Sequence, residues 1–262
     1  MIPATKLRAA AGITAAIAIC AFSAQAMAQP QQTRITASIT PSYFSGNYGT
    51  NSRTDIFYLP FELKADTGNL SLQATIPYIR VKSQNAVIAG GAVVGNAGGQ
   101  PRTRGGLGDI WLGASYRFRL DHDDVFTPYV KVKFGTASRS QGLGTGANDV
   151  EFGAKYRTRV AHDYYPFARL GYRIHGHAAG LVLRDYFTYS VGLSYASDLD
   201  DIVTLLYAGH QSSQPGLAPA SELVGGWNHR VQDNFNVQLF ALLGLSNGSP
   251  DYGGGLGLKY RF

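Results

Sequence analysis

The feature that most constrains the fold is a strict alternation of apolar and polar residues over long stretches of the chain. In the segment GGLGDIWLGASYRF, residues 105–118, Ile110 and Leu112 begin a ladder of apolar side chains, whereas Asp109 and Arg117 have the other parity. Successive side chains of a β-strand point to opposite faces, so this pattern indicates a strand whose two faces meet different surroundings. The apolar face then packs either on a protein core or on lipid.

The same pattern recurs along the chain and predicts an all-β fold without a linker. We expect twelve strands, at residues 33–45, 52–65, 69–82, 106–120, 124–137, 148–160, 164–175, 185–196, 201–212, 221–231, 234–246 and 251–262. Most are about 11 to 15 residues long, which exceeds the ~5–6 residues of soluble sheets and suits a tilted membrane-spanning strand of ~9–11 residues. A missed or split strand would change the count to ten or fourteen.

The connections between the expected strands alternate in length. The short ones suit tight hairpin turns and are DTGN (66–69), DHDD (121–124), AHD (161–163), DLDD (197–200) and VQDN (231–234). Longer links lie between them at 83–105, 138–147, 176–184 and 213–220, and two further links, 46–51 and 247–250, are short. Outer-membrane barrels have short turns on the periplasmic side and longer loops outside. An even strand count therefore places both termini in the periplasm.

The two faces of the expected strands differ in charge, and this difference favours a barrel with its apolar face toward lipid. One parity is almost free of charge, and its aromatic members gather near the short turns, as in an interfacial girdle. The other parity holds the charged side chains and many glycines, as a crowded interior would. We therefore predict a transmembrane, antiparallel, up-and-down β-barrel, and a soluble sandwich with the opposite orientation is the alternative.

The first residues predict export. Two cationic residues precede an apolar, Ala-rich run, and AMA at 26–28 has small residues at the positions before a cleavage site. We expect residues 1–28 to be removed as a signal peptide, which leaves a single domain at 29–262. An uncleaved membrane helix and acylation of Cys20 are the alternatives. Cys20 is the only cysteine, so the mature chain has no thiol for a disulfide, a metal site or a nucleophile.

The last expected strand, YGGGLGLKYRF, carries an apolar ladder that ends in an aromatic residue. Its members are Leu256, Leu258, Tyr260 and Phe262. Such an ending resembles the C-terminal signal by which bacterial outer-membrane barrels reach their assembly machinery. We therefore expect that machinery and outer-membrane lipid as partners, and the Gram-negative outer membrane as the location. Charged residues are scattered rather than clustered, so nucleic acid is not an expected partner.

Two segments resemble a known family. Residues 105–118 and 133–157 are similar to the outer-membrane transporters named for the meta-pathway of phenol degradation. The matching motifs are GLGD at Gly106–Asp109, a stretch at Phe134–Thr136, GTG at Gly144–Gly146 and Asp149 before the next strand. The chain departs from the family at KFGTAS, where a Pro-Thr-Gly is frequent. The resemblance implies an outer-membrane barrel, often encoded with catabolic genes, to which the passage of organic substrates is ascribed.

Residues of the polar parity on neighbouring strands predict a basic lumen. The expected basic arc is Arg117, Arg119, Lys131, Lys133, Lys155, Arg157, Arg169 and Arg173. The expected acidic partners are Asp109, Asp149, Glu151, Glu62 and Glu222, and the expected aromatic lining is Tyr58, Trp111, Tyr129, Phe167 and Tyr186. A positive arc attracts anions and repels cations, whereas pairing of the two charged sets stiffens the wall. The rings either stack on a solute or fill space.

These features predict a narrow channel through which small organic solutes, anionic or aromatic, diffuse without a cofactor or a bound metal. The link 84–104 either constricts the mouth or extends a hairpin. A lipid-modifying Ser/His hydrolase is one alternative, because His210 lies near Ser212, although no orienting acid or G-x-S-x-G elbow accompanies them. A structural barrel without transport is another. The pair His175 and His177 lacks an evident third metal ligand.

Overall fold

The structure is a computed structural model that describes residues 32–84, 86–89, 92–94, 100–120, 123–197 and 200–262. The predicted signal peptide lies outside the described residues. Within the described ranges the regular structure consists of β-strands: β1 (Arg34–Ile39), β2 (Ser42–Gly46), β3 (Thr54–Thr67), β4 (Leu70–Ser83), β5 (Val87–Ala89), β6 (Ala92–Val94), β7 (Arg102–Leu107), β8 (Ile110–Tyr116), β9 (Phe118–Arg119), β10 (Val125–Phe134), β11 (Asp149–Arg157), β12 (Tyr164–Ile174), β13 (Tyr186–Ala196), β14 (Asp201–His210), β15 (Ala220–Gln232), β16 (Phe235–Gly244) and β17 (Tyr252–Arg261). None of the described residues forms a helix that is long and apolar enough to cross a membrane.

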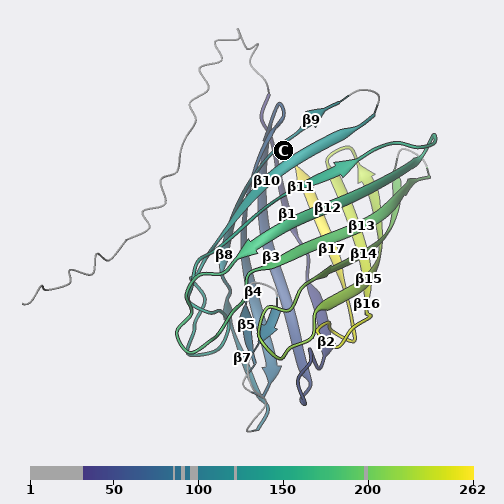
Figure 1. The fold of residues 1–262 in the computed structure, drawn as a ribbon. Coiled ribbons are helices and arrows are strands. Elements are labelled where there is room, and N and C mark those ends of the chain that lie inside the picture. The colour runs from purple at the N-terminus through teal and green to yellow at the C-terminus, as the bar shows by residue number, and fades with distance from the viewer. Residues whose placement is uncertain (1–31, 85, 90–91, 95–99, 121–122, 198–199) are drawn as a thin grey trace, which may run out of the picture. The chain divides into compact units, whose positions relative to one another are not determined.

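All of these strands except β5 and β6 belong to one antiparallel sheet that closes on itself (Figure 1). β1 and β2 follow one another along the first barrel strand, which pairs with β3 on one side and with β17 on the other. β7, β8 and β9 likewise follow one another along the fourth barrel strand. The sheet is therefore a closed barrel of twelve antiparallel strands, which confirms the predicted fold, strand order and strand count.

Closure joins the two ends of the described barrel at the side of the short turns. Arg34 is opposite Asp66 at the turn between β3 and β4, and the Phe262 amide donates to the Ile35 carbonyl at 2.9 Å. A sheet in hydrocarbon cannot leave the backbone groups of its edge strands unpaired, so pairing of the first strand with the last is the arrangement that lipid requires.

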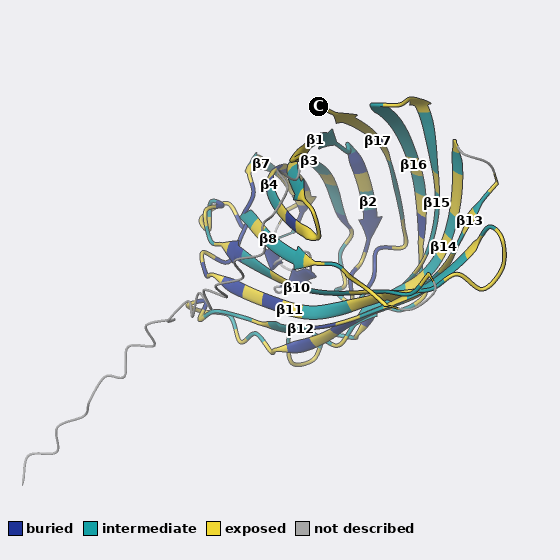
Figure 2. Ribbon diagram, turned by 90° about the horizontal axis from the view of Figure 1, so that it is seen from above, coloured by how far each residue is buried: buried dark blue, intermediate teal, exposed yellow. Residues whose placement is uncertain are grey.

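Exposure separates the two faces of the barrel as the alternation predicted. Along β8, Leu112 is 47 % and Tyr116 is 43 % exposed, whereas Trp111, which precedes Leu112, lines an interior cavity. The same alternation of exposed and less exposed positions is visible along the other strands (Figure 2). Exposed aromatic residues form one belt near the short turns and another near the long loops: Tyr116, Phe118, Phe126, Tyr156, Tyr195 and Tyr260 in the first, and Phe57, Tyr78, Phe134, Phe152, Phe187 and Tyr252 in the second. An apolar band between two aromatic belts fits a bilayer and not the core of a sandwich.

Interior aromatic side chains lie across glycines on the neighbouring strands. Tyr129 of β10 is in register with Gly153 of β11, which is in register with Gly171 of β12. A Cβ atom at either glycine would overlap the Tyr129 hydroxyl. Phe167 lies over Gly192 in the same way. Because these glycines leave room at the wall, the rings lie along it instead of projecting into the lumen.

Two segments from the long-loop end fold into the barrel. Ile88 of β5 and Leu143, from the link that follows β10, pack on Ile79 and Val81, which face inward on β4. The Ile88 amide donates to the Gly142 carbonyl at 3.0 Å, so the two segments hold each other in place. The apolar part of the link 84–104 therefore narrows the mouth of the barrel, whereas its last residues, from Arg102, pair with β4 and extend a hairpin. Both alternatives that the sequence left open are thus found in this link.

Candidate functional site: the barrel lumen

Two adjoining chambers of the lumen are lined by the described residues. The upper chamber, nearer the long loops, has a volume of about 540 Å³, and the lower chamber, nearer the short turns, has a volume of about 730 Å³. Gln73, Gly113 and Lys131 line both chambers, which therefore meet near the middle of the barrel. Both volumes lie in the range of small-molecule sites, about 300–1,000 Å³.

The lower chamber is lined by cationic side chains and, among the described residues, by no carboxylate. Its cations are Lys64, Arg117, Arg119, Lys131, Lys155, Arg157 and Arg169. Two of them have carboxylate partners at the wall, since Lys64 pairs with Asp66 at 2.8 Å and Arg169 pairs with Glu151. No described carboxylate oxygen lies within 4.0 Å of the other five. The chamber therefore has a surplus of positive charge.

Glu151 is the centre of a hydrogen-bonded network in the wall. Its carboxylate is fully buried, and it pairs with Arg169 and with Arg173, whose Nε lies 3.0 Å from Oε2. Tyr129 donates to Oε1 at 2.9 Å, and Arg173 donates to the Tyr186 hydroxyl at 2.9 Å. The network joins four neighbouring strands, β10 to β13, and holds the two guanidinium groups in fixed positions. Glu151 and Tyr186 were predicted to line the pore. They line neither of these two chambers, because the network buries them in the wall.

Lys133 was predicted to belong to the basic arc, and the structure places it elsewhere. Its side chain is fully buried, and its Nζ lies 2.7 Å from Asp149 Oδ2 and 3.3 Å from Asp109 Oδ2. The ammonium also donates to Thr145 Oγ1 at 3.2 Å. Lys133 and Asp149 line neither chamber. Two carboxylates and one inward-folded loop surround the ammonium completely, so it is not presented to the lumen.

The same carboxylates anchor backbone from two loops. Asp109 accepts a hydrogen bond from the Ala137 amide at 3.0 Å, and Asp149 accepts one from the Gly176 amide at 3.1 Å. The His175 ring is buried, with Nδ1 3.2 Å from Asp149 Oδ2. The cluster therefore closes part of the long-loop end, and its role is to hold the loops.

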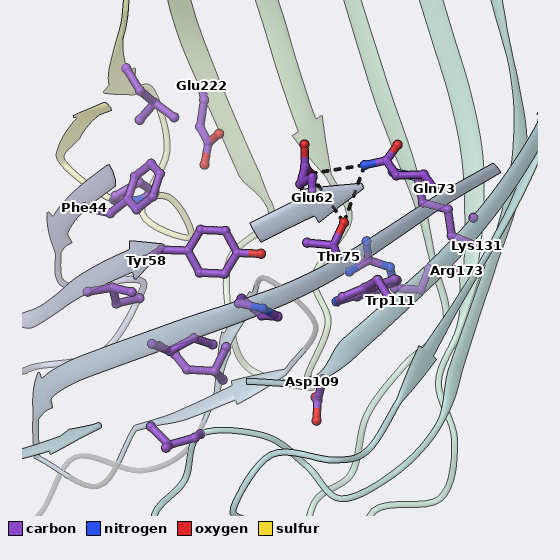
Figure 3. A pocket seen from close by; sticks show the side chains of 18 of the residues that line it. Phe44, Tyr58, Glu62, Gln73, Thr75, Asp109, Trp111, Lys131, Arg173 and Glu222 are labelled. Carbon is purple, nitrogen blue, oxygen red and sulfur yellow. Dashed lines mark hydrogen bonds between the residues drawn. The ribbon is translucent and has the colours of Figure 1, made fainter. Parts of the chain in front are cut away.

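The upper chamber combines aromatic walls with charges of both signs (Figure 3). Its aromatic side chains are Phe44, Tyr48, Tyr58, Trp111 and Phe240, and its charged side chains are Glu62, Asp109, Lys131, Arg173 and Glu222. Glu62 accepts hydrogen bonds from Gln73 at 3.1 Å and from Thr75 at 3.4 Å. The Arg173 guanidinium lies 5.2 Å from the centre of the Trp111 ring. The chamber thus offers apolar contact together with separate sites for a negative and a positive group.

The sequence reasoning missed Phe44 and Phe240 as lining residues. Phe44 is in register with Gly253 of β17, and Phe240 of β16 is in register with Gly255. A Cβ atom at either glycine would contact the ring opposite. The alternation along β16 places Phe240 on the inner face, and the glycine run in β17 marks the free space, so the parity of the two strands could have found both rings.

His210 and Ser212, the residues of the predicted hydrolase alternative, are hydrogen-bonded to the backbone instead of to each other. His210 Nδ1 lies 2.7 Å from the Gln211 carbonyl, and the Ser212 hydroxyl donates to the Gln214 carbonyl at 2.6 Å. The His210 ring stacks on Tyr186 at 4.7 Å between centres. Within the described ranges no serine hydroxyl is hydrogen-bonded to a histidine ring, and no group of three or more potential ligands is placed to hold a metal ion.

The C-terminal ladder lies on the outer face of β17. Leu256, Leu258 and Tyr260 are about 40 % exposed, and Phe262 is 74 % exposed. The strand pairs with β16 on one side and with β1 and β2 on the other, so it closes the barrel. Its recognition by the assembly machinery stays a prediction.

No protein-family model matches the chain, and no curated protein matches it. Solved structures match the fold. The COG4313 outer membrane channel from Pseudomonas putida F1 has a TM-score of 0.70 at 14 % identity, over 90 % of this chain and 97 % of that one. The NanC porin has a TM-score of 0.56 at 10 % identity, over 86 % and 100 % of the two chains, and the KdgM porin has 0.53 at 10 %, over 87 % and 99 %. The chain is therefore a porin-like β-barrel of the outer-membrane type, and at these identities the likeness concerns the fold.

Proposed function

We propose that the protein is an outer-membrane diffusion channel for small organic solutes that carry negative charge. The observation that carries this proposal is the lower chamber, where five cations without a carboxylate within 4.0 Å among the described residues share a volume of about 730 Å³. Such a lining attracts anions and repels cations.

The strength of the anion preference can be worked out from the volume of the lower chamber. One elementary charge in about 730 Å³ corresponds to a concentration of about 2 M. Five such charges therefore amount to roughly 10 M of fixed positive charge, far above the salt in any ordinary bath. Counter-ions must balance this charge, so anions outnumber cations in the chamber even where solvent weakens the field.

The form of the lumen supports a limit on solute size. The inward-folded segments with Ile88 and Leu143 narrow the mouth, and the upper chamber holds about 540 Å³. Solutes with one or two rings fit this volume. The resemblance to the transporters named for phenol degradation supports organic solutes.

The similar structures support a channel rather than an enzyme or a structural barrel. Two of the matches above are called porins and one is called a channel. A further match, with a TM-score of 0.52 at 10 % identity, is the KdgM porin in complex with disordered oligogalacturonate, which is an acidic sugar chain. That ligand belongs to the other protein, but it supports the passage of anions through a barrel of this type.

The test is the reversal potential of the purified barrel in planar lipid bilayers under a KCl gradient. The wild-type channel should conduct with a clear preference for chloride. Lys155→Gln, in the lower chamber, should move the reversal potential toward the cation side. Lys82→Gln is the matched control, because Lys82 has an exposed position on the outer face of β4 and should leave selectivity unchanged. Absence of conductance, or a preference for cations in the wild type, would refute the proposal.

A further inference from the structure

Glu62 and Glu222 stand on other parts of the upper chamber's wall than Lys131 and Arg173. In strand order around the barrel, Glu62 lies on the second strand and Glu222 on the tenth, whereas Lys131 lies on the fifth and Arg173 on the seventh. In a closed barrel of twelve strands, Glu222 is thus five strands from Lys131 and three from Arg173, whereas Glu62 is three strands from Lys131 and five from Arg173. Figure 3 shows Glu222 on one side of the chamber and Lys131 and Arg173 on the other.

Glu222 has no partner of its own among the described residues. No hydrogen bond or ion pair joins its carboxylate to another described side chain. Val224, Phe240 and Leu242 line the chamber close to it in the register of β15 and β16. A half-buried carboxylate beside apolar groups is costly unless a cation or a donor compensates it. Glu62 differs, because Gln73 and Thr75 already donate to it.

The opposite wall offers the matching positive groups. Lys131 has no described carboxylate oxygen within 4.0 Å. Arg173 presents a guanidinium whose plane is fixed by Glu151 and by the Trp111 ring. A carboxylate that enters the chamber therefore meets two cations held at one side of it.

The space between the two walls is apolar. Phe44, Tyr58 and Phe240 line it, together with Ile79 and Leu242. Aromatic faces near Glu222 favour a cation as well as an apolar body. From these placements we propose that the upper chamber binds a small zwitterion with an apolar body, its ammonium group toward Glu222 and its carboxylate toward Lys131 and Arg173. This inference rests on the proposed channel function and names the solute class that the upper chamber retains.

The test compares three probes as blockers of the chloride current through single channels in planar bilayers: L-phenylalanine, 3-phenylpropanoate, which lacks the ammonium group, and phenethylamine, which lacks the carboxylate. In the wild type, L-phenylalanine should half-block the current at a concentration about fivefold lower than 3-phenylpropanoate, which is the effect of one water-screened charge contact. Phenethylamine should block least, because the lower chamber repels it.

Glu222→Gln keeps the shape of the side chain and removes its charge, so it should abolish the fivefold difference between the first two probes. Asp163→Asn is the control, because Asp163 lies in a short turn outside both chambers, and it should preserve that difference. Folding of each variant is checked by its shift on a gel when heated. Equal half-block by the first two probes in a wild-type channel that still prefers anions, or a difference that survives Glu222→Gln, would overturn the inference alone. Loss of conductance or of anion preference in the wild type would remove the proposed function and the inference together.

Discussion

Replacement of Lys133 by methionine should destabilise the barrel by about 3–5 kcal/mol, the cost of breaking a buried ion pair by removing one partner. The methionine side chain has nearly the same length, so the change removes charge and little volume. Asp149 and Asp109 lose the ammonium that lies 2.7 and 3.3 Å from their oxygens. Each keeps one backbone donor, the amides of Gly176 and Ala137, so the loss stays within the range for a single broken pair.

The assay is urea unfolding of the refolded barrel in detergent micelles, followed by tryptophan fluorescence. The two tryptophans report different surroundings, because Trp111 faces the upper chamber and Trp227 has an exposed position on the outer face. The double variant Lys133→Met with Asp149→Asn should recover about half of the lost stability, since only Asp109 then remains without its counter-charge. Lys82→Met, at an exposed position, should stay within about 0.5 kcal/mol of the wild type. A Lys133→Met barrel as stable as the Lys82→Met barrel would refute the assigned role of the cluster.

Three further predictions concern variants of the lower chamber, of the barrel wall and of the C-terminal strand. Arg157→Glu should lower the fixed charge of the lower chamber by two units and reduce the chloride preference seen in reversal potentials; an unchanged preference would mean that ions do not pass this chamber. Gly171→Ala should force the Tyr129 ring off the wall and cost about 1–3 kcal/mol in urea unfolding, accompanied by a smaller single-channel conductance; equal stability and conductance would contradict the packing. Deletion of Phe262 should lower the amount of folded barrel in outer-membrane fractions while refolding in detergent continues, and undiminished assembly would argue against a C-terminal signal.

The twelve barrel strands could be predicted from the sequence because the period of two is a local property of the chain, whereas β5 and β6, inside the expected link, were not. Leu112 and Tyr116 face outward, and Trp111 faces the lumen, as their parity required. The twelve-strand count followed from the same pattern together with the turn residues, and the closed sheet confirms it.

Whether an inward-facing side chain reaches the lumen or is buried in the wall was harder to predict than the face of the strand on which it lies. Lys131 and Lys133 have the same parity on the same strand, yet Lys131 lines both chambers and Lys133 is fully buried. The difference arises because the link directly after β10, with Leu143 and Thr145, folds back over Lys133. The alternation of apolar and polar residues cannot predict such a loop, because the residues of the loop do not alternate.

The sequence by itself determined which side chains face lipid and which face inward, because every residue of a strand carries that information in its parity. It also determined closure, because lipid tolerates no unpaired strand edge. Only the tertiary structure decided which inward charges remain in the lumen. Burial of Glu151 and Lys133 depends on the packing of neighbouring strands and of an inward-folded loop around them. The separation of Glu222 from Lys131 across the upper chamber depends on closure of the barrel, because the two residues are far apart in the chain.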